Sequence, residues 1–229
     1  MSFLLKEQLA AAGNYGGSRS AGQIQYLVLH YTGNDGDTAA NNAAYFQRNV
    51  VKASAHYFVD DTTVYRSVPD LRSAWAVGGQ KYANADKTGG GGMYGRITNT
   101  NSISVELCDT IRNGRYQASE ATLANAAALC RDLMARYGIP LERVYRHFDV
   151  TGKHCPSYMI DGAKWAAFKR RLEDKPMDNT SKISKEAVEW MTANEIMKGD
   201  RSGDLRLSGS VTRDELSAML YRYYLKFGK

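Results

Sequence analysis

The pattern of apolar and polar positions divides most of the chain into short strands and helices. Residues 24–31, IQYLVLHY, form a nearly continuous β-favouring apolar run, which is typical of a buried strand. Apolar residues at three- and four-residue spacings predict a helix over about 119–137, which Gly138 and Pro140 end. Further strands are predicted in SAHYFVDD, TTVYRSV, NSISVELCD and LERVYRHFDV, and further helices in TAANNAAYFQRN and GAKWAAFKRRLE. Strands that alternate with helices predict an α/β domain with a central sheet.

The first twenty residues combine a short apolar patch with charged residues. Lys6 and Glu7 interrupt this patch, and the stretch lacks the basic start and unbroken apolar centre of a secretory signal. We therefore expect a short amphipathic helix here and no signal peptide. The chain also has no apolar run of the roughly 18 residues that a membrane-spanning helix needs, so no membrane insertion is expected.

The composition changes near residue 173, which predicts a second domain. The segment 174–182, DKPMDNTSK, has the composition of a linker. Two helical patterns follow within 183–229, and Thr212 with Glu215 has the spacing of a capping box at the start of the second. We predict a globular domain over 1–173, the linker over 174–182 and a small helical module over 183–229.

The overall charge narrows the class of partner only slightly. The 229 residues carry a formal net charge of +6, which favours attraction to polyanions such as nucleic acid, a membrane surface or an anionic cell wall. The basic residues are scattered along the chain, and neither a recognition helix nor a zinc-finger spacing is present. Nucleic acid is therefore the weakest of the three, and we expect no nucleic-acid partner.

Two histidines and a cysteine form a candidate metal site. His30 ends the first apolar strand, His147 ends a later predicted strand, and Cys155 follows after seven intervening residues. Three such ligands, with a fourth position left for water, suit a catalytic zinc ion. A closed structural site would need His56 or His154 as well. The spacing alone also allows each histidine to be an ordinary hydrogen-bonded residue at a strand end.

Four segments carry a resemblance to a known family. In this order, VLHYTG, SAHYFVDD, NSISVELCD and RHFDVTGKHCPS resemble the N-acetylmuramoyl-L-alanine amidase type 2 family, which shares its fold with a phage lysozyme and the peptidoglycan recognition proteins. The resemblance covers about residues 20–172, and its most specific element is His147 with Lys153, Cys155 and Pro156. It implies a central mixed sheet flanked by helices.

The resemblance also implies a zinc site and its chemistry. The family's Zn²⁺ ligands fall on His30, His147 and Cys155, its catalytic acid on Glu106 and its catalytic lysine on Lys153. Bound zinc lowers the pKa of water to about 7 and polarises a carbonyl. Glu106 would then move the proton and Lys153 would stabilise the oxyanion. The implied reaction is hydrolysis of the amide between N-acetylmuramic acid and L-alanine in peptidoglycan.

The strand NSISVEL permits the role that the resemblance gives to Glu106. Apolar side chains alternate with polar ones along it, so Glu106 points away from the apolar face, toward either a cleft or solvent. A surface carboxylate at a strand end is the alternative.

Several positions refine the comparison with the family. Some members of the family have a tyrosine where Ala55 stands, so this chain fits better the members that use a glutamate, here Glu106. The recognition proteins usually have serine in place of Cys155. Trp75 occupies the place of an aromatic residue near the substrate groove, where it would stack on a sugar or pack in the core. His56 is a further substrate-site candidate that would orient a ligand, or else a hydrogen-bonded histidine of the sheet.

The C-terminal module resembles a single S-layer homology repeat. The matching marks are the EIMKGD turn, the VTRDEL helix start and the ML-YR ending. This resemblance implies attachment to a secondary cell-wall polymer. Because a single repeat unit rarely buries its own core, we expect self-association into a homo-oligomer. The alternative is a helical hairpin that packs on the catalytic domain.

Together the two resemblances imply a phage or prophage endolysin of a Gram-positive host. Such an enzyme waits in the host cytoplasm until a holin opens the membrane, which fits the expected lack of a signal peptide. A bacterial autolysin exported by another route is an alternative. So are a non-catalytic peptidoglycan-binding protein with a vestigial zinc site and a zinc peptidase that cuts the stem peptide.

Overall fold

The chain folds as two units, Met1–Glu173 and Asp174–Lys229. The structure is a computed structural model that describes residues 3–82, 85–173, 182–199, 203, 205 and 211–228. The predicted linker, 174–182, lies outside the described residues except for Lys182. Among the described helices, none has the length and apolar character needed to cross a membrane.

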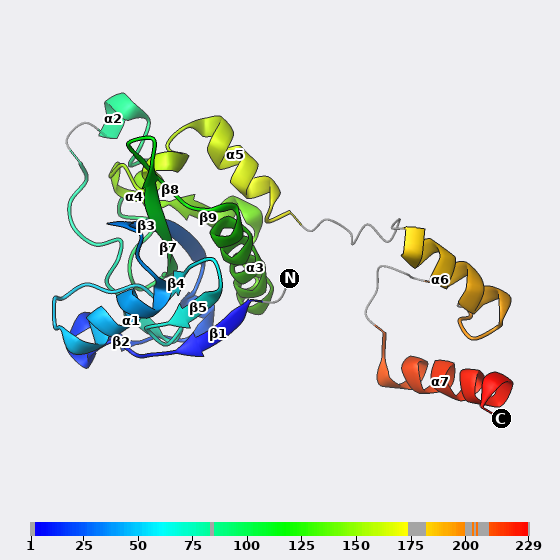
Figure 1. Cartoon of the computed structure of the whole chain (residues 1–229). Coiled ribbons are helices and arrows are strands. Elements are labelled where there is room, and N and C mark those ends of the chain that lie inside the picture. The colour runs from blue at the N-terminus through cyan, green and yellow to red at the C-terminus, as the bar shows by residue number, and fades with distance from the viewer. Residues whose placement is uncertain are drawn as a thin grey trace. The chain divides into compact units, whose positions relative to one another are not determined.

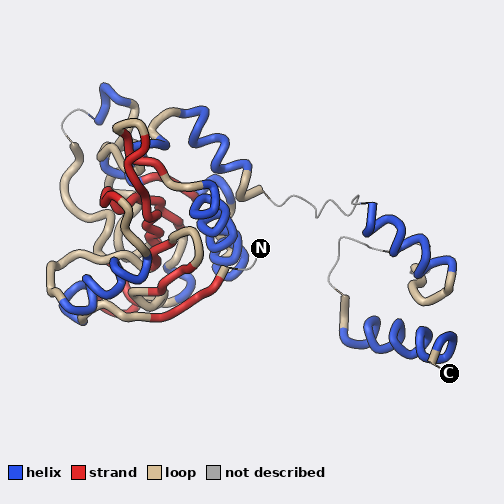
Figure 2. The backbone as a smooth tube through the Cα atoms, viewed as in Figure 1, coloured by secondary structure: helices blue, strands red, loops and turns tan. Residues whose placement is uncertain are grey.

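A seven-stranded mixed sheet forms the centre of the first unit (Figures 1 and 2). Its two long strands, β3 (Tyr26–Asp35) and β7 (Ser102–Arg112), pair in parallel. The other strands of this sheet are β1 (Leu4–Glu7), β4 (Tyr57–Val59), β5 (Thr63–Arg66), β8 (Arg115–Gln117) and β9 (Val144–Arg146). The order is β1-β5-β4-β7-β3-β9, with β8 paired to β7, and the β4–β5 and β7–β8 pairs are antiparallel. A separate antiparallel pair joins β2 (Tyr15–Ser18) to β6 (Arg72–Ala74).

Helices cover both faces of this sheet. α3 (Glu120–Tyr137) and α5 (Gly162–Arg170) pack on one face and bury the main apolar core, whereas α1 (Ala39–Arg48) packs on the other. Ser119 and the left-handed Gly138 cap the two ends of α3, and Thr38 caps the start of α1. The predicted α/β fold, a mixed sheet flanked by helices, is confirmed.

Shorter elements fill the connections between these strands and helices. They are α2 (Ala85–Thr88), α4 (His147–Thr151) and 3₁₀ turns at Ala12–Asn14, Ala21–Gln23, Leu141–Arg143 and Ser157–Met159.

Two local predictions are wrong. Leu4–Glu7 is not an amphipathic helix but an edge strand, because its backbone pairs in parallel with β5. The strand predicted through His147 ends at Arg146, and His147 begins α4. The Asp149 carboxylate accepts a hydrogen bond from the Arg146 N–H at 2.7 Å, which stabilises the start of this helix.

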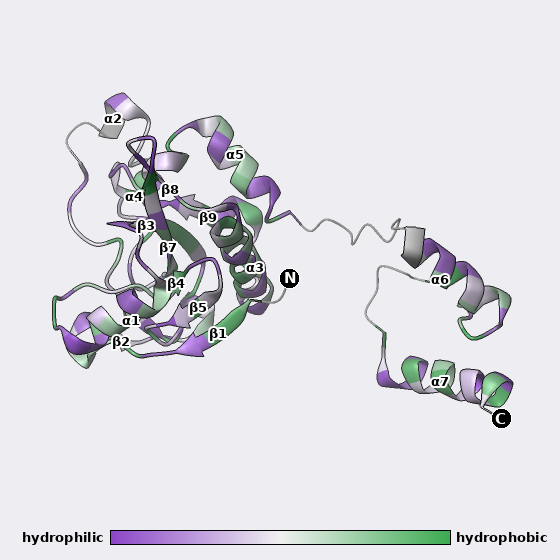
Figure 3. Cartoon of the chain, in the orientation of Figure 1, coloured by the Kyte–Doolittle hydropathy of each residue, from purple (hydrophilic) through white to green (hydrophobic). Residues whose placement is uncertain are grey.

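The second unit contains α6 (Lys182–Ala193) and α7 (Arg213–Phe227). The rings of Trp190 and Phe227 stack with centroids 5.6 Å apart, and Arg222 donates to the carbonyl of Ile196 at 2.9 Å. Thr212 and Glu215 form the predicted capping box. Hydrophobic residues recur along α7 (Figure 3), and most of them are exposed, so the described part of this unit buries little apolar surface of its own.

Candidate metal centre

The parallel pairing of β3 and β7 brings His30 and Glu106 together. The two residues are direct register partners, so their side chains leave neighbouring strands on the same face of the sheet. The Glu106 Oε1 atom lies 3.9 Å from Nδ1 of His30. The alternation within NSISVEL thus places Glu106 on the face opposite the α3 core, beside the predicted ligand.

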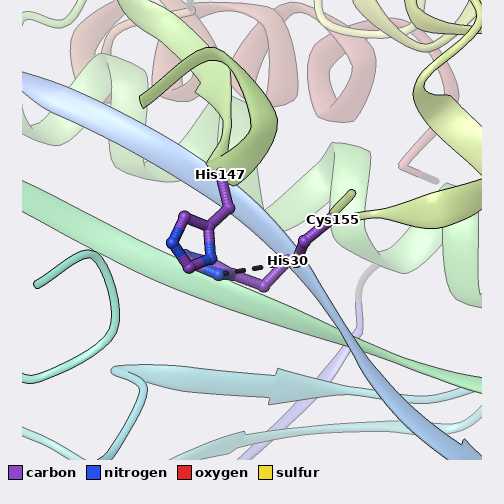
Figure 4. A group of neighbouring side chains, drawn as sticks. All are labelled: His30, His147 and Cys155. Atoms are coloured by element: carbon purple, nitrogen blue, oxygen red, sulfur yellow. Dashed lines mark hydrogen bonds between the residues drawn. The ribbon is translucent and has the colours of Figure 1, made fainter. Parts of the chain in front are cut away.

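A folded loop brings His147 and Cys155 to the same place. His147 is the first residue of α4, and Gly152, with a left-handed φ of 83°, ends the helix and reverses the chain. The N–H of Phe148 then donates to the carbonyl of Cys155 at 2.9 Å, which closes the loop. The side chains of His30, His147 and Cys155 converge (Figure 4), and Cys155 is a free thiol.

The three side chains have the spacing of a metal site. One potential ligand atom from each of them lies within 4.8 Å of the other two, and all three residues are buried. The Cys155 sulfur lies 3.8 Å from Nδ1 of His30. Zinc bonds of about 2.1 Å to nitrogen and 2.3 Å to sulfur at a tetrahedral angle would separate such atoms by about 3.6 Å. The separation of the Cys155 sulfur and the His30 nitrogen is therefore close to that of two ligands of a tetrahedral ion.

The electrostatics of the three groups also favour a cation. Burial, followed by the neighbouring His147 and Lys153, lowers the pKa of His30 well below its ordinary value, and burial lowers the pKa of His147 to about 4. Both imidazoles are therefore neutral, which is the metal-binding form. Burial raises the pKa of the Cys155 thiol, so a cation is needed to stabilise its thiolate.

Unpartnered polar atoms mark the same position. His147 Nδ1 and Glu106 Oε2 are buried and make no hydrogen bond within the protein. Because nearly all buried polar atoms in native proteins have a partner, two such atoms in one site indicate that it binds something else. The residues present therefore fit a metal ion with a polar substrate beside it.

Glu106 and Lys153 lie next to the candidate ligands. Burial raises the pKa of Glu106 to about 8, against the positive charge of Lys153, which lowers it. The side chain of Glu106 keeps 20% of its surface exposed, so it is accessible from the cavity. Lys153 is exposed on the cavity wall, and its charge also lowers the pKa values of both histidines.

The metal group opens into a cavity of about 710 Å³. Its lining includes all five predicted catalytic and metal residues, together with the half-buried Trp75. The helix α1 supplies a wall that the sequence interpretation missed, formed by Asn41, Asn42 and Tyr45. A polar and an aromatic side chain four residues apart, on the helix that follows the His30 strand, were the available signal.

His56 does not line this cavity. It is fully buried, and its Nδ1 accepts a hydrogen bond from the N–H of Ser104 at 3.0 Å. Its Nε2 lies 2.8 Å from an Arg19 nitrogen and 3.0 Å from the carbonyl of Arg72. Both ring nitrogens are therefore engaged, which fits a hydrogen-bonded histidine of the sheet rather than a substrate contact. His154 is exposed and packs edge-on against Phe148, so it does not join the metal group.

Comparisons with known proteins agree on one family. The family model N-acetylmuramoyl-L-alanine amidase, Amidase_2, matches residues 20–158. XlyB of Bacillus subtilis (strain 168), an N-acetylmuramoyl-L-alanine amidase, is 31% identical over 204 residues, covering 87% of this chain and 58% of XlyB. The chain spans about half the length of the curated relatives it matches.

Solved structures match about three quarters of the chain. A point mutant of PlyL has a TM-score of 0.58 at 28% identity and covers 76% of this chain and 99% of its own. A mutant endolysin from Bacillus subtilis has a TM-score of 0.57 at 26% identity and covers 74% of this chain and 99% of its own. With a family model that matches more than half of its residues, the chain belongs to the N-acetylmuramoyl-L-alanine amidase family.

Proposed function

We propose that the first unit hydrolyses the amide bond between N-acetylmuramic acid and L-alanine in peptidoglycan, with Zn²⁺ held by His30, His147 and Cys155. The observation that carries this proposal is the convergence of the three buried ligand atoms, within 4.8 Å of one another, in a cavity that also contains Glu106. The family membership and the names of the relatives support the choice of substrate.

The residues divide the chemistry of amide hydrolysis between them. Bound zinc supplies Lewis-acid polarisation and lowers the pKa of water. Glu106 takes the proton of the attacking water and returns it to the leaving amide nitrogen, a role for which a pKa raised above that of an ordinary carboxyl is suited. The exposed ammonium of Lys153 stabilises the negative charge that develops on the carbonyl oxygen.

The cavity supplies the binding surface for the two sides of that bond. Its volume of about 710 Å³ lies within the usual range of roughly 300–1,000 Å³ for ligand sites. Trp75 presents an aromatic surface on which a sugar ring stacks, and the α1 wall with Asn41 and Tyr45 offers amide and hydroxyl groups for the stem peptide.

The test is a digestion of purified Gram-positive cell walls followed by analysis of the new chemical ends. The amidase proposal predicts new L-alanine amino termini without new reducing sugars. New amino termini elsewhere in the stem would identify a peptidase instead. Binding to walls without any new ends, from a chain that contains stoichiometric zinc, would identify a receptor.

We further propose that the protein acts as a phage or prophage endolysin, made in the host cytoplasm and released to the wall through a holin. The likeness to an endolysin structure from Bacillus subtilis supports this role. Expression with and without a holin in a Gram-positive host tests it, because lysis is expected only when both proteins are present.

For the second unit we propose wall attachment to a secondary polymer through a homo-oligomer. The large apolar side chains of α7 that remain at least 43% exposed support it: Leu216, Leu220, Tyr221, Tyr223, Tyr224, Leu225 and Phe227. Light scattering on the full chain and on Leu220→Ser with Tyr224→Ser tests the association. A monomeric wild-type chain would contradict it. Pelleting with walls stripped of secondary polymer tests the ligand.

A further inference from the structure

A buried arginine immediately precedes the candidate ligand His147 in sequence and has no place in the chemistry above. Arg146 precedes His147 and is only 8% exposed. Its Nε and Nη2 donate to the two carboxylate oxygens of Asp149 at 3.0 and 2.6 Å. Its Nη1 donates to the carbonyls of Met159 and Ile160 at 2.7 and 3.0 Å.

These contacts join the two ends of the loop that supplies two of the three ligands. Asp149 lies in α4, two residues after His147, whereas Met159 and Ile160 follow Cys155 by four and five residues. The guanidinium therefore spans the base of the loop His147–Cys155. The rings of Phe148 and Trp165 pack against it, with centroids 5.0 and 5.3 Å from its central carbon. The four hydrogen bonds and the two ring contacts together hold the guanidinium in one position.

We propose that Arg146 is a positioning residue that fixes the separation of His147 and Cys155 and so raises the affinity of the site for zinc. This inference rests on the proposed zinc site. A loop that carries two ligands loses conformational entropy when it closes on an ion, and a clamp that holds it closed beforehand removes part of that loss. Groups that orient metal ligands from outside typically contribute about 10- to 100-fold in metal affinity.

The chemistry of the contacts explains why the residue is arginine. One planar fork donates to a carboxylate on one side and to two carbonyls on the other, and a lysine ammonium lacks that reach and geometry. Stability alone is a poor reason for such a residue, because a buried ion pair is often no more stabilising than apolar residues of similar volume. The fixed separation of His147 and Cys155 explains the presence of Arg146 better.

The experiment measures zinc affinity of the full chain by competition with a chromophoric chelator, for wild type, Arg146→Met and Arg146→Lys. Arg143→Met is the matched control, because Arg143 is exposed, lies three residues away and gives the same change in charge. We expect Arg146→Met to bind zinc about 10- to 100-fold more weakly, Arg146→Lys to recover only part of the loss, and Arg143→Met to match wild type. The thermal unfolding of each zinc-free protein is measured beside it.

Cobalt substitution provides a second readout that a merely structural role would not change. Arg146→Lys, the variant that keeps the charge, is expected to shift the thiolate-to-cobalt absorption band, because the band depends on the position of Cys155 relative to the ion. Wild-type affinity and spectrum in both Arg146 variants would overturn the inference, whatever their unfolding temperatures. A wild-type chain that bound no zinc would overturn the zinc site itself, and the inference with it. If Arg146→Met does not fold, Arg146→Lys decides.

Discussion

The two faces of the strand pair β3 and β7 carry opposite kinds of residue. On the face that α3 covers, the side chains are apolar and fully buried, namely Leu27, Leu29, Ile103, Val105 and Leu107. On the other face, the side chain of His30 is 2% exposed and that of Glu106 is 20% exposed, yet each retains a buried polar atom without a hydrogen bond. The same two strands therefore stabilise the fold on one face and bear a stability cost on the other.

Along these two strands, the residues that stabilise the fold and the residues that serve the site occupy alternate positions. Side chains alternate between the two faces of a strand, so consecutive residues serve different purposes: one packs in the apolar core and the next faces the metal site. Unpartnered polar groups destabilise a fold by about 1–3 kcal/mol each, so their retention indicates that they have a partner during function. Changes on the polar face should therefore affect zinc binding and turnover, and changes on the apolar face should affect unfolding.

Removal of zinc should have the largest effect. Dialysis against a strong chelator is expected to abolish wall hydrolysis, and zinc added back is expected to restore it. The unfolding temperature should also fall on chelation, because an ion that binds only the folded chain stabilises it by mass action. Calorimetry and a turnover assay on the same samples measure both effects. Full activity in a sample shown to be free of zinc would contradict the assignment of the metal site.

Substitution of Glu106 should remove turnover without weakening the fold. Glu106→Gln keeps the shape of the side chain but cannot accept a proton, so we expect turnover to fall by about 10²- to 10⁴-fold. The unfolding free energy should stay equal or rise, because a buried carboxyl without a partner is replaced by a neutral amide. Glu142→Gln, at an exposed position, is the control. Normal turnover in Glu106→Gln would remove Glu106 from the mechanism.

Truncation on the apolar side should give the reverse result. Leu133 in α3 is fully buried against the apolar face. Leu133→Ala is expected to lower the unfolding free energy by about 2–5 kcal/mol, through lost burial and the cavity that remains. Turnover per folded molecule, measured well below the unfolding midpoint, should match wild type. A loss of turnover in fully folded Leu133→Ala would show that the two faces are coupled.

The sequence predicted this division only in part. Alternation along NSISVEL was sufficient to place Glu106 opposite the apolar face, and the apolar run 24–31 identified β3. The register that sets Glu106 beside His30 depends on pairing between distant segments, which neither pattern specifies. The same dependence explains the missed edge strand, where pairing with β5 decides the conformation of Leu4–Glu7.

Residues of the cavity were harder to predict than the ligands. The ligand types and the matching segments pointed to His30, His147 and Cys155, whereas Asn41 and Tyr45 line the cavity only because of how α1 sits on the sheet. For His56 the sequence left two roles open. It was a candidate either to orient a ligand or to hydrogen-bond within the sheet, and the contacts of its two ring nitrogens with Ser104 and with Arg19 and Arg72 favour the second role.

A pH titration of stability should show the smallest effect. It tests the interpretation of His56 as a buried and neutral histidine that is hydrogen-bonded within the sheet. Burial, followed by the charge of Arg19, lowers the pKa of His56 to about 3 in the folded chain, from an ordinary value of 6.5. Well above pH 6.5 the His56 imidazole is neutral in both the folded and the unfolded chain, so it adds no pH dependence to stability. Below it the unfolded chain takes up a proton that the folded chain excludes, so stability falls as the pH falls. Between pH 7 and pH 5 the loss is about 2 kcal/mol.

The other buried histidines have the same sign, so the slope must be assigned by difference. His30 and His147 also have lowered pKa values in the folded chain, and both remain in a His56→Gln variant. The variant is expected to be less stable than wild type at pH 7, since it loses hydrogen bonds to Ser104 and its neighbours, but to lose about 2 kcal/mol less on acidification. Urea unfolding at both pH values, on zinc-free samples, measures the difference. An equal loss in both proteins would mean that His56 takes up a proton in the folded chain and is not held neutral by its burial.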